Sequence, residues 1–212
     1  MISNIFPPGA STVPQLRLAA KAWAVANKDI SSKRTAQIIS TFIRDPSPMK
    51  KCMGGILLGY MPAQRRTLNP SLYDEWLEHT EGWAAIDAIC YGNFTADEIL
   101  GNFAGWKALI KRLTRSKNVN KRRAALVLLT KPVKQSDDIR LSQLAFGVVD
   151  ALKTEKSILI TKAVSWLLRN LAKLHPEEVK EYLHSQKDQL PKIAIRETVN
   201  KLKHGKKAGR TP

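Results

Sequence analysis

The sequence predicts an all-α protein made of helical hairpins, and three observations support this prediction. Apolar residues recur at helical spacing along most of the chain. Prolines and capping residues divide it into about eleven segments of roughly 8–17 residues, a common length for helices. No segment has the alternating pattern of a β-strand. Segments of this length and pairing are typical of hairpins stacked into a curved α-solenoid with a concave face, and a compact irregular helical bundle is the alternative architecture.

In the first half of the chain, local signals predict five helices after an irregular lead-in, residues 1–13. Proline and polar capping residues mark their starts, and Asp45-Pro46 and Pro62 mark two of their ends. The glycines Gly54, Gly55 and Gly59 allow close packing of the third helix or weaken it. The expected helices cover residues 14–27, 32–44, 48–60, 71–78 (with Leu72, Trp76 and Leu77 facing inward) and 83–90.

The second half of the chain shows the same succession of capping residues and helices. Thr95 caps a short helix, Asn120 is the expected N-cap of the helix over 121–130, and Ser136 to Asp138 is a strong helix start. Further helices are expected over 103–116, 139–153, 157–173, from Pro176, and from Pro191 with Ile195, Val199 and Leu202 on its apolar stripe. Residues 205–212 read as a basic disordered tail, so we predict a single domain over residues 14–204.

Composition excludes several classes of protein. With 212 residues and 43% hydrophobic residues, the chain can bury one core and is not largely disordered. No apolar run reaches the roughly 20 residues of a membrane span. The start lacks the regions of a signal peptide, so we expect an intracellular, cytoplasmic protein, nucleoid-associated if bacterial. Two cysteines and four scattered histidines lack ligand spacing, so we expect no metal. We also expect no cofactor and a monomer.

Charge is the strongest compositional signal, because 35 Lys and Arg against 18 Asp and Glu give a net charge of +17. Such an excess of positive charge indicates a polyanionic partner, most often nucleic acid. A ribosome-associated protein or a protein that binds membrane surfaces can have the same net charge. The segment from Ile99 to Ser136 contains no acid and ten basic residues. Phosphates explain such a stretch better than an inert solvated face, so it predicts a basic groove. The predicted DNA-binding residues are Lys107, Lys111, Arg112, Arg115, Lys117, Lys121 and Arg122.

Trp83 and Asp87 form the most informative pair. They lie four residues apart, so a helix places them on one face, with Ile86 and Ile89 on the neighbouring buried stripe. An aspartate inside a helix beside tryptophan and isoleucines costs stability unless something compensates. The alternative is a tryptophan at the edge of the core, with a carboxylate that pairs with a distant Lys or Arg.

Several motifs together resemble one family. They are Gly82-Trp83 with Asp87 four residues after the tryptophan, Lys121-Arg122-Arg123-Ala124-Ala125, Lys162-Ala163-Val164-Ser165-Trp166-Leu167-Leu168-Arg169, Pro176-Glu177-Glu178-Val179 and Arg196-Glu197. Their order and separations resemble the AlkD-like DNA alkylation repair family, the HEAT-like-repeat alkylpurine DNA glycosylases. The resemblance runs from about residue 47 to 204, whereas the first 45 residues match weakly.

The resemblance implies hydrolysis of the N-glycosidic bond of N3- and N7-alkylated purines in duplex DNA, on the concave face of HEAT-like repeats and without a pocket for a flipped base. It places the catalytic carboxylate on Asp87, the lesion-binding tryptophans on Trp83 and Trp166, and the arginine that helps to hold DNA on Arg123, or Arg122 with an offset of one. For both arginines, a phosphate contact is expected rather than an intramolecular ion pair, because no acid lies nearby in sequence. For Trp166 a core position is the alternative.

The chain departs from the family at two positions. Ala84 stands where a second aromatic residue often follows the first tryptophan, and Asn120 stands where a tryptophan commonly begins the Arg-Arg helix. These departures bear on substrate range and rate more than on reaction type, because Asp87 is present. The alternative functions are a non-catalytic helical-repeat protein that binds DNA or RNA and, less well supported, a protein-interaction scaffold. Asp87 favours catalysis, because a carboxylate facing a polyanion is repulsive unless it performs chemistry.

Overall fold

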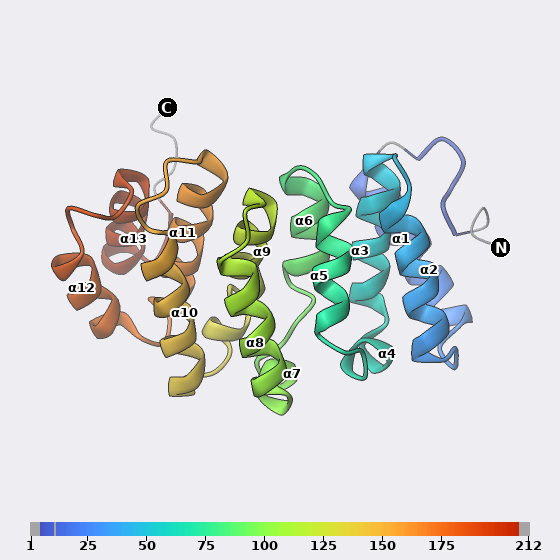
Figure 1. The fold of residues 1–212 in the computed structure, drawn as a ribbon, viewed down its shortest axis with the longest axis horizontal. Helices are drawn as coiled ribbons and strands as arrows, with labels where there is room; N and C mark the ends of the chain where they lie inside the picture. Colours follow the sequence, from blue (N-terminus) through green and yellow to red (C-terminus); the bar gives the residue numbers. More distant parts are fainter. Residues whose placement is uncertain (1–4, 11, 208–212) are drawn as a thin grey trace. The chain divides into compact units, whose positions relative to one another are not determined.

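The computed structural model describes residues 5–10 and 12–207, and in this part of the chain every regular element is a helix. The described residues contain thirteen α-helices and one 3₁₀ helix, which confirms the predicted all-α helical-repeat class (Figure 1). None of the described helices is long and apolar enough to span a bilayer. The helices fall into two compact units, which meet in sequence between Asn93 and Phe94. The single domain expected over residues 14–204 stays a prediction.

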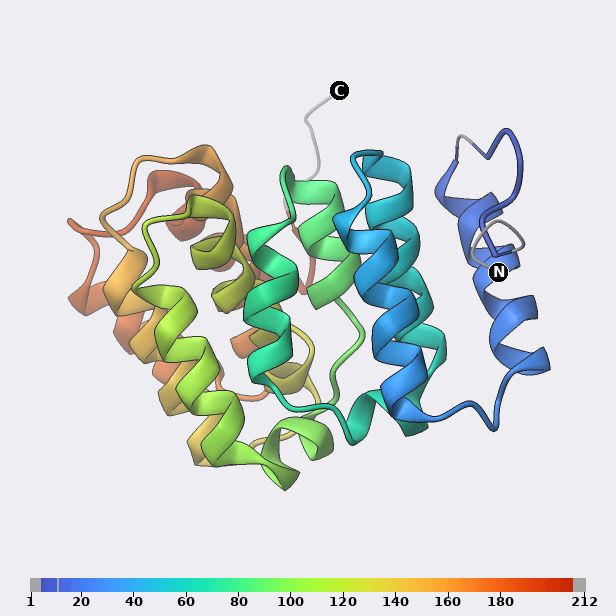
Figure 2. The same ribbon diagram turned by 45° about the vertical axis from the view of Figure 1, so that its right-hand side comes forward.

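The first unit is organised around a central helix, α3, which contacts α1, α2 and α6. Figures 1 and 2 show α2 and α3 side by side. The helices of the unit are α1 (Val13–Ala26), α2 (Ser32–Arg44), α3 (Pro48–Tyr60), α4 (Pro62–Arg66), α5 (Ser71–Glu78) and α6 (Trp83–Cys90). Short turns connect α2 to α3 and α5 to α6, so both pairs form the predicted hairpins. Phe42, Met53, Leu57 and Ile86 are fully buried between these helices.

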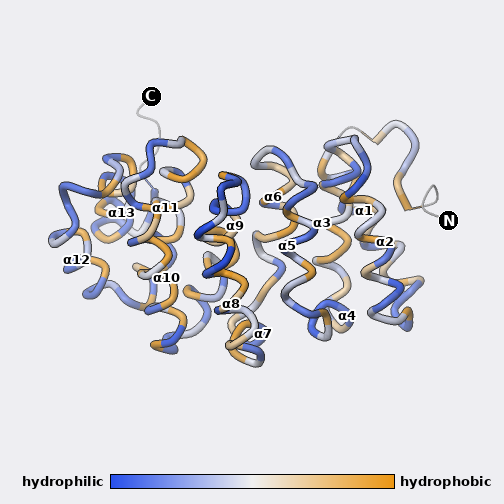
Figure 3. The backbone as a smooth tube through the Cα atoms, in the orientation of Figure 1, coloured by the Kyte–Doolittle hydropathy of each residue, from blue (hydrophilic) through white to orange (hydrophobic). Residues whose placement is uncertain are grey.

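The second unit consists of three further hairpins, α8–α9, α10–α11 and α12–α13, preceded by the short α7. Its helices are α7 (Ala96–Gly101), α8 (Phe103–Thr114), α9 (Val119–Leu129), η1 (Pro132–Lys134), α10 (Ile139–Leu152), α11 (Ile158–Leu171), α12 (Pro176–Ser185) and α13 (Lys192–His204). Helix α11 packs against both α9 and α13. Figure 3 shows that α9 is hydrophilic at its start and hydrophobic beyond, and the residues from Ala124 to Leu129 are all buried. The buried end of α9 therefore anchors its basic first turns.

Local sequence signals predicted most helix starts correctly. The Ser31 hydroxyl accepts a hydrogen bond from the backbone of Arg34, and the Asp138 carboxylate accepts one from the backbone of Arg140. Thr95 and Glu98 form a reciprocal capping box at the start of α7. In each case the side chain satisfies a backbone N–H group that the first helical turn leaves without a partner.

One sequence expectation about a helix boundary is wrong, and one short helix was not predicted. Asn118 rather than Asn120 caps α9, since its side chain accepts a hydrogen bond of 2.9 Å from the backbone of Asn120. Both asparagines satisfy the local capping rule, and the fold uses the first one. Pro62 does end α3, but it also begins the short helix α4 at the position that suits proline best. The sequence predicts only the first of these two roles of Pro62.

Two expected buried faces also differ from the structure. On α5, Tyr73 is buried and Leu72 only half-buried. On α13, the buried residues are Ala194, Glu197 and Thr198 instead of the apolar stripe of Ile195, Val199 and Leu202. The reason on α13 is a buried carboxylate with partners from other segments, which apolar periodicity does not reveal.

Glu197 connects α11, α13 and the residues after α13. Its carboxylate accepts a hydrogen bond of 2.6 Å from the Ser165 hydroxyl and lies 3.4 Å from Arg169 Nε and 3.0 Å from Lys207 Nζ. Burial alone would raise the pKa of Glu197, but the hydrogen bonds from Ser165 and Lys207 and the charge of Arg169 outweigh it and lower the pKa. Lys207, just beyond the end of α13, therefore holds an ion pair with Glu197. The expected disorder of the tail over residues 205–212 stays a prediction. Residues 208–212 lie outside the described residues.

Candidate active site on helix α6

Trp83 and Asp87 line one cavity of about 460 Å³ in the first unit. Gly82 has a φ of 76°, a left-handed conformation that favours glycine, and it turns the chain directly into α6. Trp83 then occupies the first helical position and is 61% exposed, while Ile86 and Ile89 are fully buried, as predicted. An exposure of 61% excludes the alternative of a tryptophan at the edge of the core. The aromatic face of Trp83 is therefore accessible beside the half-buried Asp87.

Helix α6 lies unusually close to α3. A Cβ atom on Gly55 of α3 would lie only 2.5 Å from the carbonyl carbon of Ala88, which follows Asp87 directly. Any side chain at Gly55 would push the helices apart, so this glycine sets the depth at which α6 packs. The sequence expectation that the glycines of α3 permit close packing is confirmed at this position.

Asn93 fixes the end of α6 to the same helix. Its side-chain amide donates to the carbonyl groups of Gly55, Ala88 and Ile89 at 3.1, 2.9 and 2.8 Å. The last two are carbonyl groups of the final turn of α6, which has no further helical partner for them. Gly59 leaves room for this side chain, because a Cβ atom there would lie 2.6 Å from Asn93 Oδ1. Asn93 and the two glycines thus hold Asp87 in a defined place.

Arg17, Tyr60 and Tyr91 also line the cavity, and none of them is among the site residues that the sequence predicts. Tyr91 follows Asp87 by four residues and is 43% exposed, so the repeat of Trp83, Asp87 and Tyr91 was a readable signal. Arg17 comes from α1 and Tyr60 from the end of α3, and only the fold brings them to α6. The cavity therefore combines one carboxylate, three aromatic side chains and one cation.

Cys52 of α3 also lines this cavity, where it is only 6% exposed. Burial raises the pKa of its thiol above the ordinary value. Among the described residues, no group of three or more His, Cys, Asp or Glu side chains is arranged to hold a metal ion.

Arg123 and Trp166 lie in the second unit, on α9 and α11, which contact each other. The guanidinium of Arg123 donates a hydrogen bond of 2.8 Å to the carbonyl of Leu159, and the residue is 6% exposed. Lys121, two residues earlier, is buried as well. Trp166 is half-buried, unlike Trp76 and Trp106, which lie in the core. Its surroundings therefore differ from those of the core tryptophans, and its role stays a prediction.

The expectation that Arg122 makes no intramolecular ion pair is wrong. Its Nε lies 2.6 Å from Glu155 Oε1, and its NH2 group donates to Glu155 Oε2 at 2.9 Å. The third guanidinium nitrogen, Nη1, donates to the carbonyls of Ser116 and Lys117. Glu155 is 33 residues away and reaches Arg122 because the α8–α9 and α10–α11 hairpins are neighbours. Arg122 thus connects the turn before α9 with the turn before α11 through hydrogen bonds and an ion pair.

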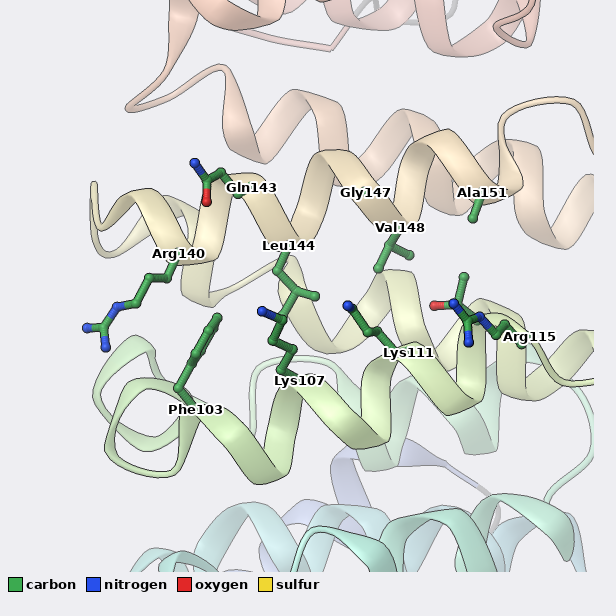
Figure 4. Close-up of a pocket in the computed structure, with 11 residues that line it drawn as sticks. Phe103, Lys107, Lys111, Arg115, Arg140, Gln143, Leu144, Gly147, Val148 and Ala151 are labelled. Carbon is green, nitrogen blue, oxygen red and sulfur yellow. The ribbon is translucent and has the colours of Figure 1, made fainter.

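The ten basic residues between Ile99 and Ser136 do not form one surface. Lys107, Lys111 and Arg115 border a separate groove between α8 and α10, shown in Figure 4. Neither Arg123 on α9 nor Trp166 on α11 lines that groove. The turn at residues 115–118 reverses the chain, so side chains before and after it point to different places. Arg112 and Lys117 are exposed outside the groove.

Comparison with known proteins gives one consistent assignment. Residues 8–202 match the model of the family described as DNA alkylation repair enzyme. A solved structure described as a predicted DNA alkylation repair enzyme from Enterococcus faecalis has the same fold, with a TM-score of 0.76 and 18% sequence identity. The match covers 96% of this chain and 92% of that one. No curated protein matches the sequence.

Proposed function

The chain belongs to the DNA alkylation repair enzyme family, and we propose that it is a DNA glycosylase for N3- and N7-alkylated purines in duplex DNA. The observation that carries this proposal is the cavity in which Asp87 lies beside the exposed ring of Trp83. The sequence singles out both residues as a pair, by their helical spacing and by the resemblance to the family. The cavity adds two tyrosines and one arginine to them.

The chemistry of the substrate suits these side chains. An alkylated purine carries a positive charge, so it is already a good leaving group, and breaking its glycosidic bond builds positive charge on the deoxyribose. A carboxylate such as that of Asp87 stabilises this oxocarbenium-like charge and orients the attacking water. The faces of Trp83 and Tyr91 attract a cationic base through the quadrupole of the ring. Arg17 supplies a positive charge for a phosphate at the edge of the same cavity.

Asp87 also separates catalysis from simple binding. In a protein with a net charge of +17, lysine and arginine suffice to hold DNA. A carboxylate in a DNA-facing cavity repels phosphates and lowers affinity. We therefore assign Asp87 to the reaction and keep the non-catalytic DNA- or RNA-binding protein as the second candidate. In this proposal Arg123, Trp166, Arg112 and Lys117 of the second unit contact DNA.

The test is single-turnover release of 7-methylguanine or 3-methyladenine from methylated duplex DNA by the purified full chain, with unmethylated duplex as the control. We expect release from methylated DNA alone, without added metal or cofactor. Binding of the duplex without release of either base would leave the non-catalytic candidate. Absence of both binding and release would contradict both candidates.

A further inference from the structure

The groove between α8 and α10 has a volume of about 410 Å³ and a strongly basic border (Figure 4). Phe103, Lys107, Lys111 and Arg115 follow one another at every fourth position, so they form one stripe along α8. Figure 4 shows these side chains directed toward α10, which contributes Arg140 at the same end as Phe103. No lining residue is shared with the Asp87 cavity. The groove is therefore a separate place on the molecule.

The positive charge of this groove is largely uncompensated. Among the described residues, no carboxylate pairs with Lys107, Lys111 or Arg115, and no acid lines the groove. Arg140 differs, because its guanidinium lies 2.6 Å from Asp138 Oδ2. Three cations close together along one helix repel one another, so an anionic ligand would relieve this repulsion.

The floor of the groove is aliphatic. It is formed by Leu144 and Val148 of α10, both largely buried, and by the small residues Gly147 and Ala151. Gly147 lies inside α10, where glycine is less stable than alanine. It has no positive φ, and a Cβ atom there would meet nothing within 4 Å. Neither backbone conformation nor packing requires this glycine, and its effect is to keep the groove open.

We propose that this groove binds an acidic segment of a partner protein that carries aliphatic side chains. Asp and Glu side chains of that segment pair with Lys107, Lys111 and Arg115, and its Leu, Ile or Val side chains pack on Leu144 and Val148. The stripe from Phe103 to Arg115 is about 18 Å long at 1.5 Å per residue. It therefore accommodates about five extended residues or about three turns of a helix.

The lining favours a peptide over nucleic acid. A rigid duplex presents phosphates on its outside, and its apolar groups lie inside its own grooves, where a floor between two helices does not reach them. Unpaired bases bind by stacking on aromatic rings. Phe103 is the aromatic residue of this groove, and Lys107 Nζ and Arg140 Cζ lie 5.7 and 5.5 Å from the centre of its ring. Because these two cations lie close to the Phe103 ring, the ring is less open to stacking by a base. The apolar contacts that the groove offers to a ligand are therefore those of Leu144 and Val148.

The experiment uses a library of displayed random twelve-residue peptides, selected on the full chain and then depleted on Gly147→Leu. This variant fills the groove with a better helix former, and Gly101→Leu is its steric control, because a Cβ atom at Gly101 also meets nothing within 4 Å. The best peptide is then labelled and titrated by fluorescence anisotropy. Lys107→Gln/Lys111→Gln removes charge from the groove, and Lys187→Gln/Lys192→Gln removes equal charge from exposed positions elsewhere.

We expect the enriched peptides to combine Asp or Glu with aliphatic residues. Their affinity should fall about tenfold or more in Gly147→Leu and in Lys107→Gln/Lys111→Gln, and should change less than about threefold in both controls. Three results would overturn the proposal. They are no enrichment, equal binding to the control variants and the groove variants, and a loss of duplex DNA affinity in Gly147→Leu with retained melting temperature, which would assign the groove to nucleic acid.

Discussion

Gly55 and Ala88 are in backbone contact: a Cβ atom on Gly55 would lie 2.5 Å from the carbonyl carbon of Ala88. This contact joins α3 to the turn of α6 that carries Asp87. Two helices can approach so closely only where one of them has no side chain. The position of the candidate catalytic carboxylate thus depends on a residue that contributes no functional group.

Gly55→Ala should lower stability by about 1–3 kcal/mol, because the added methyl group overlaps the backbone of α6. It should also lower the rate of base release by more than the loss of folded protein explains. Gly147→Ala is the matched control and should be neutral or stabilising by up to about 1 kcal/mol, since its methyl group meets open space. Thermal melting and single-turnover release measure both effects. Equal melting temperatures of the two variants would contradict the packing argument.

Asp87→Asn keeps the shape of the side chain and removes its charge. We expect base release to slow about a hundredfold, which corresponds to about 3 kcal/mol of transition-state stabilisation. Affinity for undamaged duplex should stay the same or rise slightly, because one negative charge is lost. Asp188→Asn, at an exposed position of the second unit, is the control and should react at the wild-type rate. Equal rates of Asp87→Asn and wild type would remove Asp87 from the mechanism.

Trp166→Ala and Trp106→Ala should have different effects. Trp106 is buried, with its ring centre 4.7 Å from that of Phe94, so its loss should cost about 3–5 kcal/mol of stability. Trp166 is only half-buried, and its replacement should slow base release while binding of undamaged DNA stays nearly intact. Melting curves and base-release assays on both variants distinguish a role of Trp166 in base release from a role in the core. If Trp166→Ala unfolds as readily as Trp106→Ala, the core role is the correct one.

The Arg122–Glu155 pair should contribute measurably to stability. Both side chains are about four-fifths buried and share two contacts, so a double-mutant cycle with alanine should give a coupling of about 1–3 kcal/mol. The exposed pair of Lys180 and Glu177, 2.7 Å apart, is the control, with an expected coupling of about 0.2–0.5 kcal/mol. Urea unfolding of the single and double variants yields both values. Additivity at Arg122 and Glu155 would show that their contact does not stabilise the protein.

Glu197 should make stability depend on pH. Its pKa is lowered in the folded protein, so the stabilisation is fully present above the ordinary value of 4.5 and is lost as the pH falls through the lowered value. We expect the difference in melting temperature between wild type and Glu197→Gln to shrink on acidification from pH 7 to below about 4. Glu181→Gln, at an exposed position, should show no such trend. A difference that stays constant with pH would contradict the assignment.

The sequence predicts what depends on neighbouring residues. The caps Ser31, Thr95 and Asp138 act over two to three positions, so their helices were placed correctly. The pair of Trp83 and Asp87 was recognised for the same reason. Contacts between distant segments have no such signal, which explains why the ion pair of Arg122 was missed.

Reversals of the chain limit the prediction of surfaces. The basic stretch from Ile99 to Ser136 is continuous in sequence, but the turn at residues 115–118 separates its α8 lysines from the arginines of α9. Arg17 and Tyr60 line the Asp87 cavity, although no pattern in the sequences of their helices predicts a site. Charge along a sequence therefore predicts a class of partner better than it predicts one binding face.

Cys52 has a consequence for the resistance of the protein to chemical damage. The electrophiles that alkylate purines also attack sulfur, and they react with the thiolate far faster than with the thiol. Because burial raises the pKa of Cys52, a smaller fraction of it is ionised at neutral pH than of an exposed cysteine. Cys52 in the wall of the cavity should therefore react more slowly with such electrophiles than an exposed cysteine would.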